Sequence, residues 1–181
     1  MGRRKSFEPV EILDRAMQAF WRQGFEATSI DDLVTATGIN RASLYGTFGD
    51  KAALFQACLE RYADQIVRPS LAALAKGDPG AVPRFLKALA AYAASDPKRQ
   101  GCLIVNTAVE TTTHDAETLA AIRSHFSRLE DAFAGALEAD APERARGQAR
   151  LALCLAAGLL VLGKAGVERG ALEDAVQVGF G

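Results

Sequence analysis

The stretch "TSIDDLVTATGINRASLYGTFGDK", residues 28–51, decides the fold of this chain. Its apolar residues recur at helical spacing in two runs, Ile30, Leu33 and Val34 and then Leu44 and Phe48. Between the runs, Gly38 suits the end of one helix and Ile39 is an apolar plug in the turn. Two short helices joined by a tight glycine-containing turn are typical of a helix-turn-helix.

Helix-boundary residues extend this interpretation along the first 70 residues. We expect a first helix from Pro9 to Gln23, because proline suits the first turn and Gly24 suits the position just past the end. A fourth helix is expected over about 51–68, ended or kinked by Pro69. The expected N-terminal caps are Thr28 or Ser29 for the second helix, Asn40 for the third and Asp50 for the fourth.

The rest of the chain has the pattern of a larger helical body. Helical periodicity marks a segment around Phe85 to Tyr92, the segment "CLIVNTAVETTT", and two long runs at about 115–138 and 142–168. The ending "ALEDAVQVGFG" is short and apolar, and "VQVGFG" looks short for a final helix. We therefore expect an all-α protein, with a small N-terminal unit of 1–50 and a body of 69–181 joined by the fourth helix.

The composition limits the possible function. The chain has 181 residues, 49% of them hydrophobic, and a net charge of −1. A general nucleic-acid binder is usually strongly basic, so any DNA contact must come from a local patch. The cysteines at 58, 102 and 154 are widely separated, which favours a reducing cytoplasm over a disulfide framework. No apolar signal core opens the sequence, and the apolar run between Arg150 and Lys164 is short of the about 20 residues that span a bilayer.

The third helix has an unusual set of outward residues. With Leu44 and Phe48 inward, Arg41, Ala42, Ser43, Tyr45 and Thr47 lie on or beside the exposed side. Arginine can read guanine with two hydrogen bonds, and hydroxyl groups donate to phosphate oxygens. The alternative is an αα-corner that serves only as core, because short helix pairs with a glycine turn are common. Asp31, Asp32 and Asp50 also reduce the positive charge. The N-terminal arm Arg3, Arg4 and Lys5 either offsets this in part by contacting the DNA backbone or minor groove, or is only a solubilising disordered end.

Residues 12–62 closely resemble the DNA-binding domain of the TetR/AcrR family of bacterial regulators. The match consists of Thr28, Ile30, Leu33, Val34, Gly38, Ile39, Leu44, Tyr45, Phe48 and Lys51. Two positions depart from the family pattern: Asn40 stands where serine is usual, and Thr47 where histidine is common. The resemblance implies that Arg41, Ala42 and Ser43 face the DNA groove. It also implies phosphate contacts by Thr28, Tyr45, Thr47 and Lys51.

The same resemblance implies that 69–181 is an effector-binding and dimerisation domain. Small residues in the penultimate helix, Ala152, Ala156, Ala157, Gly158 and Gly163, favour close packing against a second copy, although the interior of one protomer is the alternative. An effector pocket is expected among the middle helices. Its candidates are Phe85, Tyr92, Cys102, Leu103, Asn106, Thr107, Glu110, His114, His125, Phe126, Leu129 and Phe133. Each of these residues has core or surface packing as its alternative role.

The chain is therefore interpreted as a cytoplasmic, homodimeric repressor that a small-molecule effector releases from double-stranded operator DNA. Cys102 follows a glycine at a helix start, where a reactive thiol or a small buried side chain is possible. We expect no cofactor and no membrane contact. We also expect no metal site, because His114 and His125 on one helix would be about 16 Å apart, too far to bind one ion. An enzyme is disfavoured, since no nucleophile elbow, phosphate loop or triad is present. A DNA-binding structural or partner-binding protein without an effector stays open.

Overall fold

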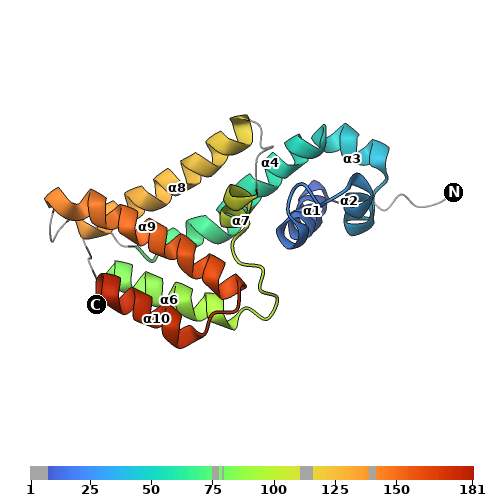
Figure 1. The fold of residues 1–181 in the computed structure, drawn as a ribbon. Coiled ribbons are helices and arrows are strands. Elements are labelled where there is room, and N and C mark those ends of the chain that lie inside the picture. Colours follow the sequence, from blue (N-terminus) through green and yellow to red (C-terminus); the bar gives the residue numbers. More distant parts are fainter. Residues whose placement is uncertain (1–7, 75–77, 79, 111–115, 139–141) are drawn as a thin grey trace. The chain divides into compact units, whose positions relative to one another are not determined.

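The computed structural model describes residues 8–74, 78, 80–110, 116–138 and 142–181. Every regular element in these residues is a helix, so the prediction of an all-α fold is confirmed. The chain divides into two units, Met1–Gln65 and Ile66–Gly181. The first unit contains α1 (Pro9–Gln23), α2 (Ile30–Thr37), α3 (Arg41–Phe48) and α4 (Lys51–Tyr62) (Figure 1).

The predicted helix starts are confirmed in the first unit. Each capping side chain accepts a hydrogen bond from the backbone N–H three residues further on, which satisfies a donor that the helix leaves free. These caps are Ser29 for α2, Asn40 for α3 and Asp50 for α4. Gly24 and Gly38 follow α1 and α2 with positive φ angles of 86° and 75°, which glycine adopts without steric cost.

Aromatic rings from α1, α4 and the loop after α1 fill the interior of the first unit. Phe20 on α1 and Phe55 on α4 are buried and meet edge to face, with ring centroids 4.9 Å apart. Phe25 joins them at 4.8 Å from Phe55. Trp21 on α1 meets Tyr62 on α4 in the same way at 4.9 Å. This packing holds α1 against α4, and α2 contacts α1 while α3 contacts α4.

An ion pair ties the same two helices together near the end of α4. Arg61 on α4 donates from Nε and Nη2 to the two carboxylate oxygens of Asp14 on α1, at 2.6 and 2.8 Å. This hydrogen bonding holds the pKa of the Asp14 carboxyl below its ordinary value, against the smaller opposing effect of burial. Two parallel N–H···O bonds fix the orientation of both groups as well as their distance.

The fourth helix ends earlier than its predicted boundary at about residue 68. Its α-helical part stops at Tyr62, and a π-helical turn (Ala63–Val67) and the four-residue helix α5 (Arg68–Leu71) follow. Proline has no N–H, and its ring clashes with the carbonyl four residues earlier in a regular α-helix. The wider π-turn just before Pro69 avoids that clash, so the proline acts several residues upstream of its own position.

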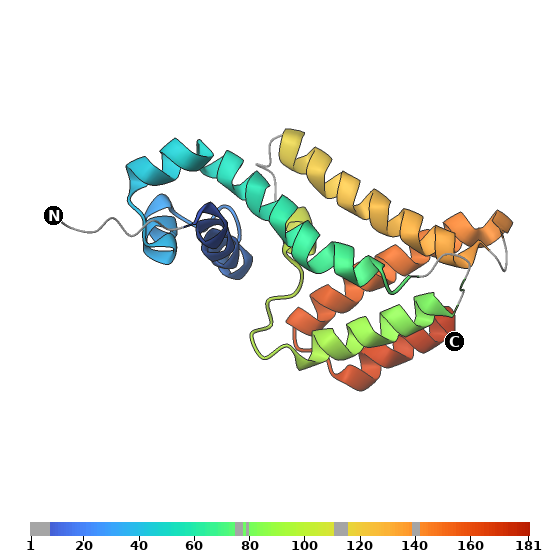
Figure 2. The same ribbon diagram turned by 180° about the vertical axis from the view of Figure 1, so that it is seen from behind.

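The second unit contains α6 (Ala81–Ser95), α7 (Leu103–Val109), α8 (Ala116–Leu137), α9 (Pro142–Lys164) and α10 (Arg169–Phe180). The helix α9 packs on α8 and on α6, and α10 lies alongside α6 (Figures 1 and 2). The ending predicted as a short tail is thus a twelve-residue helix. Its length follows from tertiary packing, since Leu172 and Val176, four residues apart, are buried against the core.

The small residues of α9 divide between two environments. Ala152, Ala156 and Gly163 are buried within the protomer. A Cβ added at Gly163 would lie 2.6 Å from the Cβ of Ala93 on α6, so this glycine permits close contact between the two helices. The prediction that these three residues face a second copy is wrong, and the alternative of a protomer interior applies to them. Gly158 instead has nothing within 4 Å of its Cβ position.

Candidate nucleic-acid interface

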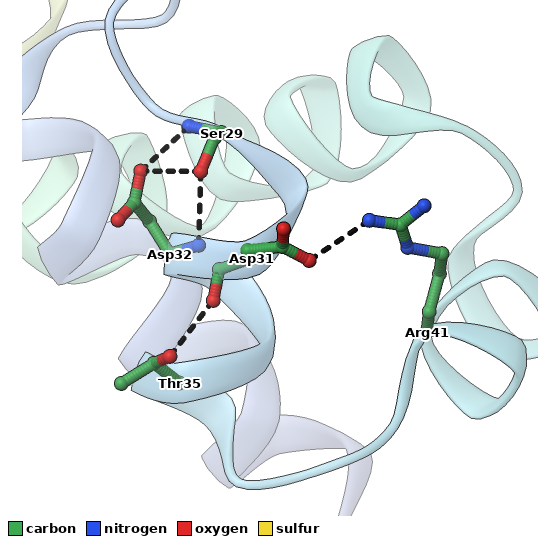
Figure 3. A network of polar contacts seen from close by, with 5 residues as sticks. All are labelled: Ser29, Asp31, Asp32, Thr35 and Arg41. Carbon is green, nitrogen blue, oxygen red and sulfur yellow. Dashed lines mark hydrogen bonds and ion pairs between the residues drawn. The ribbon is translucent and has the colours of Figure 1, made fainter.

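The N-terminal turn of α2 is held by a closed set of hydrogen bonds (Figure 3). Ser29 Oγ accepts from the Asp32 N–H at 3.1 Å, and the Ser29 N–H donates to Asp32 Oδ2 at 2.9 Å. The Ser29 hydroxyl also donates to this carboxylate at 2.6 Å, and these bonds lower the pKa of Asp32. Such a reciprocal capping box satisfies two otherwise free donors and fixes where α2 begins.

The third helix presents the side chains that the sequence predicted to face outward. Asn40 Oδ1 accepts from the Ser43 N–H at 2.8 Å, which caps α3 at its first turn. Leu44 is buried and Phe48 half-buried, so these two residues anchor the helix to the unit. The exposed set is Arg41, Ala42, Ser43, Tyr45 and Thr47. The orientation of α3 is therefore as predicted, and a polar face lies at its N-terminal end.

Arg41 does not extend freely from this face. Its Nη2 lies 2.8 Å from Oδ1 of Asp31, on the first turn of α2, and both side chains are exposed (Figure 3). In the sequence, Asp31 was recognised only as an acid that reduces the positive charge near the third helix. The two residues are ten positions apart and lie on different helices, so the i, i+3 and i, i+4 spacings that identify ion pairs within one helix do not apply to them.

Two other predicted contact residues, Thr47 and Lys51, have partners inside the unit. Thr47 donates its hydroxyl to the Ser43 carbonyl at 2.9 Å, while Tyr45 keeps 40% of its surface exposed. Lys51 Nζ lies 4.4 Å from the centre of the Phe25 ring, a cation–π distance that directs the ammonium group. These contacts leave the side chains at the surface and restrict their directions.

Thr28 has a different environment from the rest of the predicted set. Its side chain is fully buried, and its hydroxyl donates to the Gly24 carbonyl at 2.5 Å. A buried hydroxyl with this partner closes the loop between α1 and α2 and does not face solvent. The arm residues Arg3, Arg4 and Lys5 lie outside the described residues.

The acidic residues around the face have structural roles. Asp32 belongs to the capping box of α2, Asp50 caps α4 through the Ala53 N–H at 2.8 Å, and Asp31 holds Arg41. Each carboxylate thus accepts hydrogen bonds from the protein's own N–H groups. Their negative charge is partly compensated where it lies, at helix N-termini that favour anions.

Several effector-pocket candidates in the second unit serve internal packing. Phe85 meets the fully buried Phe133 edge to face, with ring centroids 5.5 Å apart. Thr107 is buried and donates to the Leu103 carbonyl at 2.8 Å. Asn106 Nδ2 donates to the Gln100 carbonyl at 2.7 Å. These contacts account for the side chains without a ligand.

The remaining candidates lie in varied surroundings. Tyr92, near the end of α6, is 47% exposed, and His125 on α8 is buried. Cys102 stands at the N-cap of α7, and Glu110 follows the end of that helix. Phe126 is half-buried, and His114 lies outside the described residues. Binding of an effector by this set stays a prediction.

A second surface of interest is apolar. On α9, the residues of one side recur every three or four positions and are exposed or lie in open space: Leu151, Cys154, Gly158, Val161 and Leu162. On α10, Val178 is 91% exposed. The Cβ position of Gly179 lies 3.6 Å from the Leu155 side chain, which places the end of α10 beside this part of α9. We call Leu151, Val161, Leu162 and Val178 the α9/α10 face.

The α9/α10 face explains why α9 has the properties of a membrane helix. In the part of the chain that the structure describes, α9 alone is long and apolar enough to cross a bilayer, a test that core helices also pass. Only 28% of its most apolar 18-residue stretch is buried in the protomer. The helix therefore has one apolar side buried in the core and a second apolar side exposed on the protomer surface.

Comparisons with known proteins agree with this architecture. Residues 12–58 match the family described as "Bacterial regulatory proteins, tetR family". Residues 80–178 match the family "Transcriptional regulator LmrA/YxaF-like, C-terminal domain". The first match lies within the helix-turn-helix unit, and the second lies within the helical body.

Two curated relatives are similar over most of this chain. The uncharacterized HTH-type transcriptional regulator YezE of Bacillus subtilis (strain 168) is 35% identical over 74% of this chain and 70% of its own length. The HTH-type transcriptional repressor ComR of Escherichia coli (strain K12) is 33% identical over 71% of this chain. The match spans 63% of ComR, slightly less than two thirds of that protein.

Solved structures share the whole fold. A cysteine-substituted variant of the TetR family transcriptional regulator CifR, complexed with a 26-base-pair operator duplex, superposes with a TM-score of 0.86. It is 26% identical and covers 99% of this chain and 98% of that chain. The reduced form of E. coli NemR superposes with a TM-score of 0.79 at 21% identity, covering 94% and 93%, which shows likeness of fold.

Proposed function

We propose a mode of action for this chain, which belongs to the TetR family of bacterial regulatory proteins. It is a DNA-binding transcriptional regulator and not an enzyme. The proposal is that two copies form a cytoplasmic repressor that binds an operator through α3 and leaves it when a small molecule binds the second unit. The observation that carries the proposal is the capped, outward face of α3.

The α3 face divides into base-reading and phosphate-binding parts in this proposal. Residues near the N-terminus of a recognition helix contact base edges, so Arg41, Ala42 and Ser43 are assigned to the major groove. Tyr45, Thr47 and Lys51 are assigned to phosphates, which fix the position of the helix on the duplex. Arginine can bind guanine O6 and N7 with two hydrogen bonds, so Arg41 is the residue expected to contribute most to sequence preference.

Thr28 receives a different role because its side chain is buried. Its hydroxyl donates to the Gly24 carbonyl and is unavailable to a phosphate unless the loop opens. We assign Thr28 to the support of the loop that precedes α2. The phosphate contacts of the proposal therefore rest on three side chains and on the helix N-termini.

The α9/α10 face is the proposed contact between the two copies. Exposed apolar side chains on two adjacent helices lose water when a twin packs on them, and a two-fold axis buries each of them twice. Gly158 has open space at its Cβ position in the protomer, which permits close approach of a partner helix. Of the small residues that suggested a dimer, Gly158 thus supports the contact, while Ala152, Ala156 and Gly163 support the protomer.

Release by an effector follows from the requirement for two half-sites. A dimer of this type binds when its two recognition helices match major grooves one helical turn apart, about 34 Å. A ligand that prefers a conformation with another separation shifts the population away from the DNA-binding state. Tyr92, Cys102, Glu110, His125 and Phe126 are the retained candidates for contacting that ligand.

The test is binding to duplex DNA measured by fluorescence anisotropy across a salt series. The duplexes are the region upstream of the protein's own gene, the best sequence selected from a random pool, and a scrambled control. We expect sequence-dependent binding with two protomers per duplex. Arg41→Ala should weaken binding to the selected duplex by about 1–3 kcal/mol and binding to the scrambled duplex much less.

Equal loss on the selected and scrambled duplexes would show that Arg41 contacts phosphate and not a base. Binding without any sequence preference would contradict the regulator mode of action. A thermal-shift screen against metabolites tests the effector, because a ligand that binds the folded state raises the midpoint. A ligand found in this way must also lower operator affinity, or the release mechanism is wrong.

A further inference from the structure

The ion pair between Arg41 and Asp31 lies on the surface assigned to DNA. Arg41 is the first residue of α3 and Asp31 is in the first turn of α2, and the pair joins Nη2 to Oδ1 at 2.8 Å. In a helix-turn-helix, the first helix crosses the DNA backbone while the second enters the major groove. A carboxylate at the start of α2 therefore repels nearby phosphates, which is unfavourable on any duplex.

Both members of the pair stand on fixed backbone. The capping box of Ser29 and Asp32 sets the first turn of α2, and the Thr35 hydroxyl donates to the Asp31 carbonyl at 2.8 Å. Asn40 caps α3 immediately before Arg41. The carboxylate thus lies at a defined point relative to the start of the recognition helix, and it selects one direction for a long, otherwise flexible side chain.

The geometry of the contact leaves the arginine able to bind a base. A single guanidinium nitrogen contacts Asp31, and the other terminal nitrogen points away from it (Figure 3). A guanidinium has five N–H donors, so a pair with one oxygen leaves several of them for a second partner. An arginine that is held on one side and free on the other can donate to a base without leaving its carboxylate.

We propose that Asp31 is a positioning residue for sequence discrimination, which rests on the proposed function. On the preferred sequence, Arg41 donates to a base while it keeps its contact with Asp31. On other sequences, Arg41 gains most by turning to a phosphate, and this movement requires that the ion pair break. Asp31 thereby weakens non-specific binding more than specific binding, although it lowers affinity for both.

The expected size follows from the exposure of the pair. Side-chain exposures of 58% and 84% make it a surface ion pair, which changes an equilibrium by at most about fivefold. Asp31→Ala should therefore lower the ratio of affinities for the selected and scrambled duplexes about two- to fivefold for each bound protomer, and by the square of that factor for the dimer. The released Arg41 of each protomer should also add one phosphate contact on the scrambled duplex, so the slope of log K against log salt becomes steeper by about 0.9 per protomer, or about 1.8 for the dimer.

The experiment compares this ratio in the full-length protein and its variants, with circular dichroism to confirm folding. The duplexes are the best sequence that the wild type selects from a random pool and a scrambled duplex of the same composition. Glu11→Ala is the matched control, because it also removes an exposed carboxylate from the first turn of a helix in the same unit. Glu11→Ala should leave the affinity ratio unchanged. Asp31→Glu, which keeps a carboxylate at this position, should retain much of the wild-type ratio.

The background Arg41→Ala separates positioning from general electrostatics. If Asp31 acts through Arg41, Asp31→Ala in this background should not change the ratio any further. An equal rise in affinity on both duplexes, or the same fall of the ratio without Arg41, would overturn the proposal while leaving the regulator function intact. A wild type that shows no preference between the duplexes would overturn both.

Discussion

The α9/α10 face gives the sharpest prediction about assembly, through Val178→Asp. Val178 is 91% exposed in the protomer, on a helix whose inward residues Leu172 and Val176 are buried. The substitution therefore changes no contact of the protomer core. If a second copy covers this face, the substitution removes an apolar contact and places a carboxylate in a dry interface.

The magnitude follows from the area that a partner would cover. Complete burial of a valine side chain is worth about 1.5–2 kcal/mol, and nearly the whole side chain is available in this protomer. A two-fold axis makes each contact occur twice, so the dimer should lose about 3–4 kcal/mol. This loss corresponds to a dissociation constant several hundredfold higher, at about 1.4 kcal/mol for each factor of ten. Desolvation of the two carboxylates adds to it.

Sedimentation equilibrium across a concentration series measures this change. Val109→Asp is the matched control, because Val109 is a 65% exposed valine of the same unit that lies on α7 and not on the face. We expect the control to dimerise like the wild type, and Val178→Asp to be a folded monomer with weakened operator binding. A Val178→Asp protein that dimerises as tightly as the control would refute the assignment of the face.

Three further predictions concern the stability of the folded chain, measured by urea unfolding. Ser29→Ala should lower the free energy of unfolding by about 1 kcal/mol, because it removes the cap of α2; no change would mean that the capping box contributes nothing in solution. Asp14→Asn should cost about 1 kcal/mol at pH 7, through the partly exposed pair with Arg61. Since folding lowers the pKa of Asp14, this difference should be present above its ordinary pKa of 3.8 and disappear as pH falls through the lower folded value; a difference that persists in acid would contradict the ion-pair origin. Gly163→Ala should lower the free energy of unfolding by about 1–3 kcal/mol, because the added methyl group overlaps with α6. Gly147→Ala on the same helix has open space and should raise it by up to about 1 kcal/mol. Changes of the same sign in both variants would refute the packing argument.

The helix boundaries of the first unit could be predicted because their causes are local. A capping side chain accepts from an N–H three residues away, so Ser29, Asn40 and Asp50 can be recognised in the sequence without knowledge of the fold. The end of the fourth helix was less certain. Pro69 perturbs the turn before it, and whether that turn becomes a kink, an end or a π-turn depends on the packing of its neighbours.

Other features required three-dimensional information. The burial of Thr28 depends on the closure of the loop between α1 and α2, and the pairing of Asp31 with Arg41 depends on the turn between α2 and α3. The hydrophobic periodicity of the sequence does not predict either of them. On α9, apolar and small residues occur on all sides, so the sequence could not tell which of them meet α6 and which stay exposed. The sequence predicted too short a last helix because the helix is stabilised by the burial of Leu172 and Val176 against the core, and not by a local end signal.

The acidic balance of the chain and the proposed dimer have a common physical consequence. A unit whose acidic residues balance its cations gains little from phosphates alone, so one protomer should bind any duplex weakly. Useful affinity then requires both protomers to bind at once, because the second half-site is reached at the high local concentration that the dimer provides. A change in separation that disengages one half-site removes that advantage completely. In the proposed mode of action, a weakly binding half would thus allow a modest conformational shift, or the loss of the α9/α10 face, to release the operator.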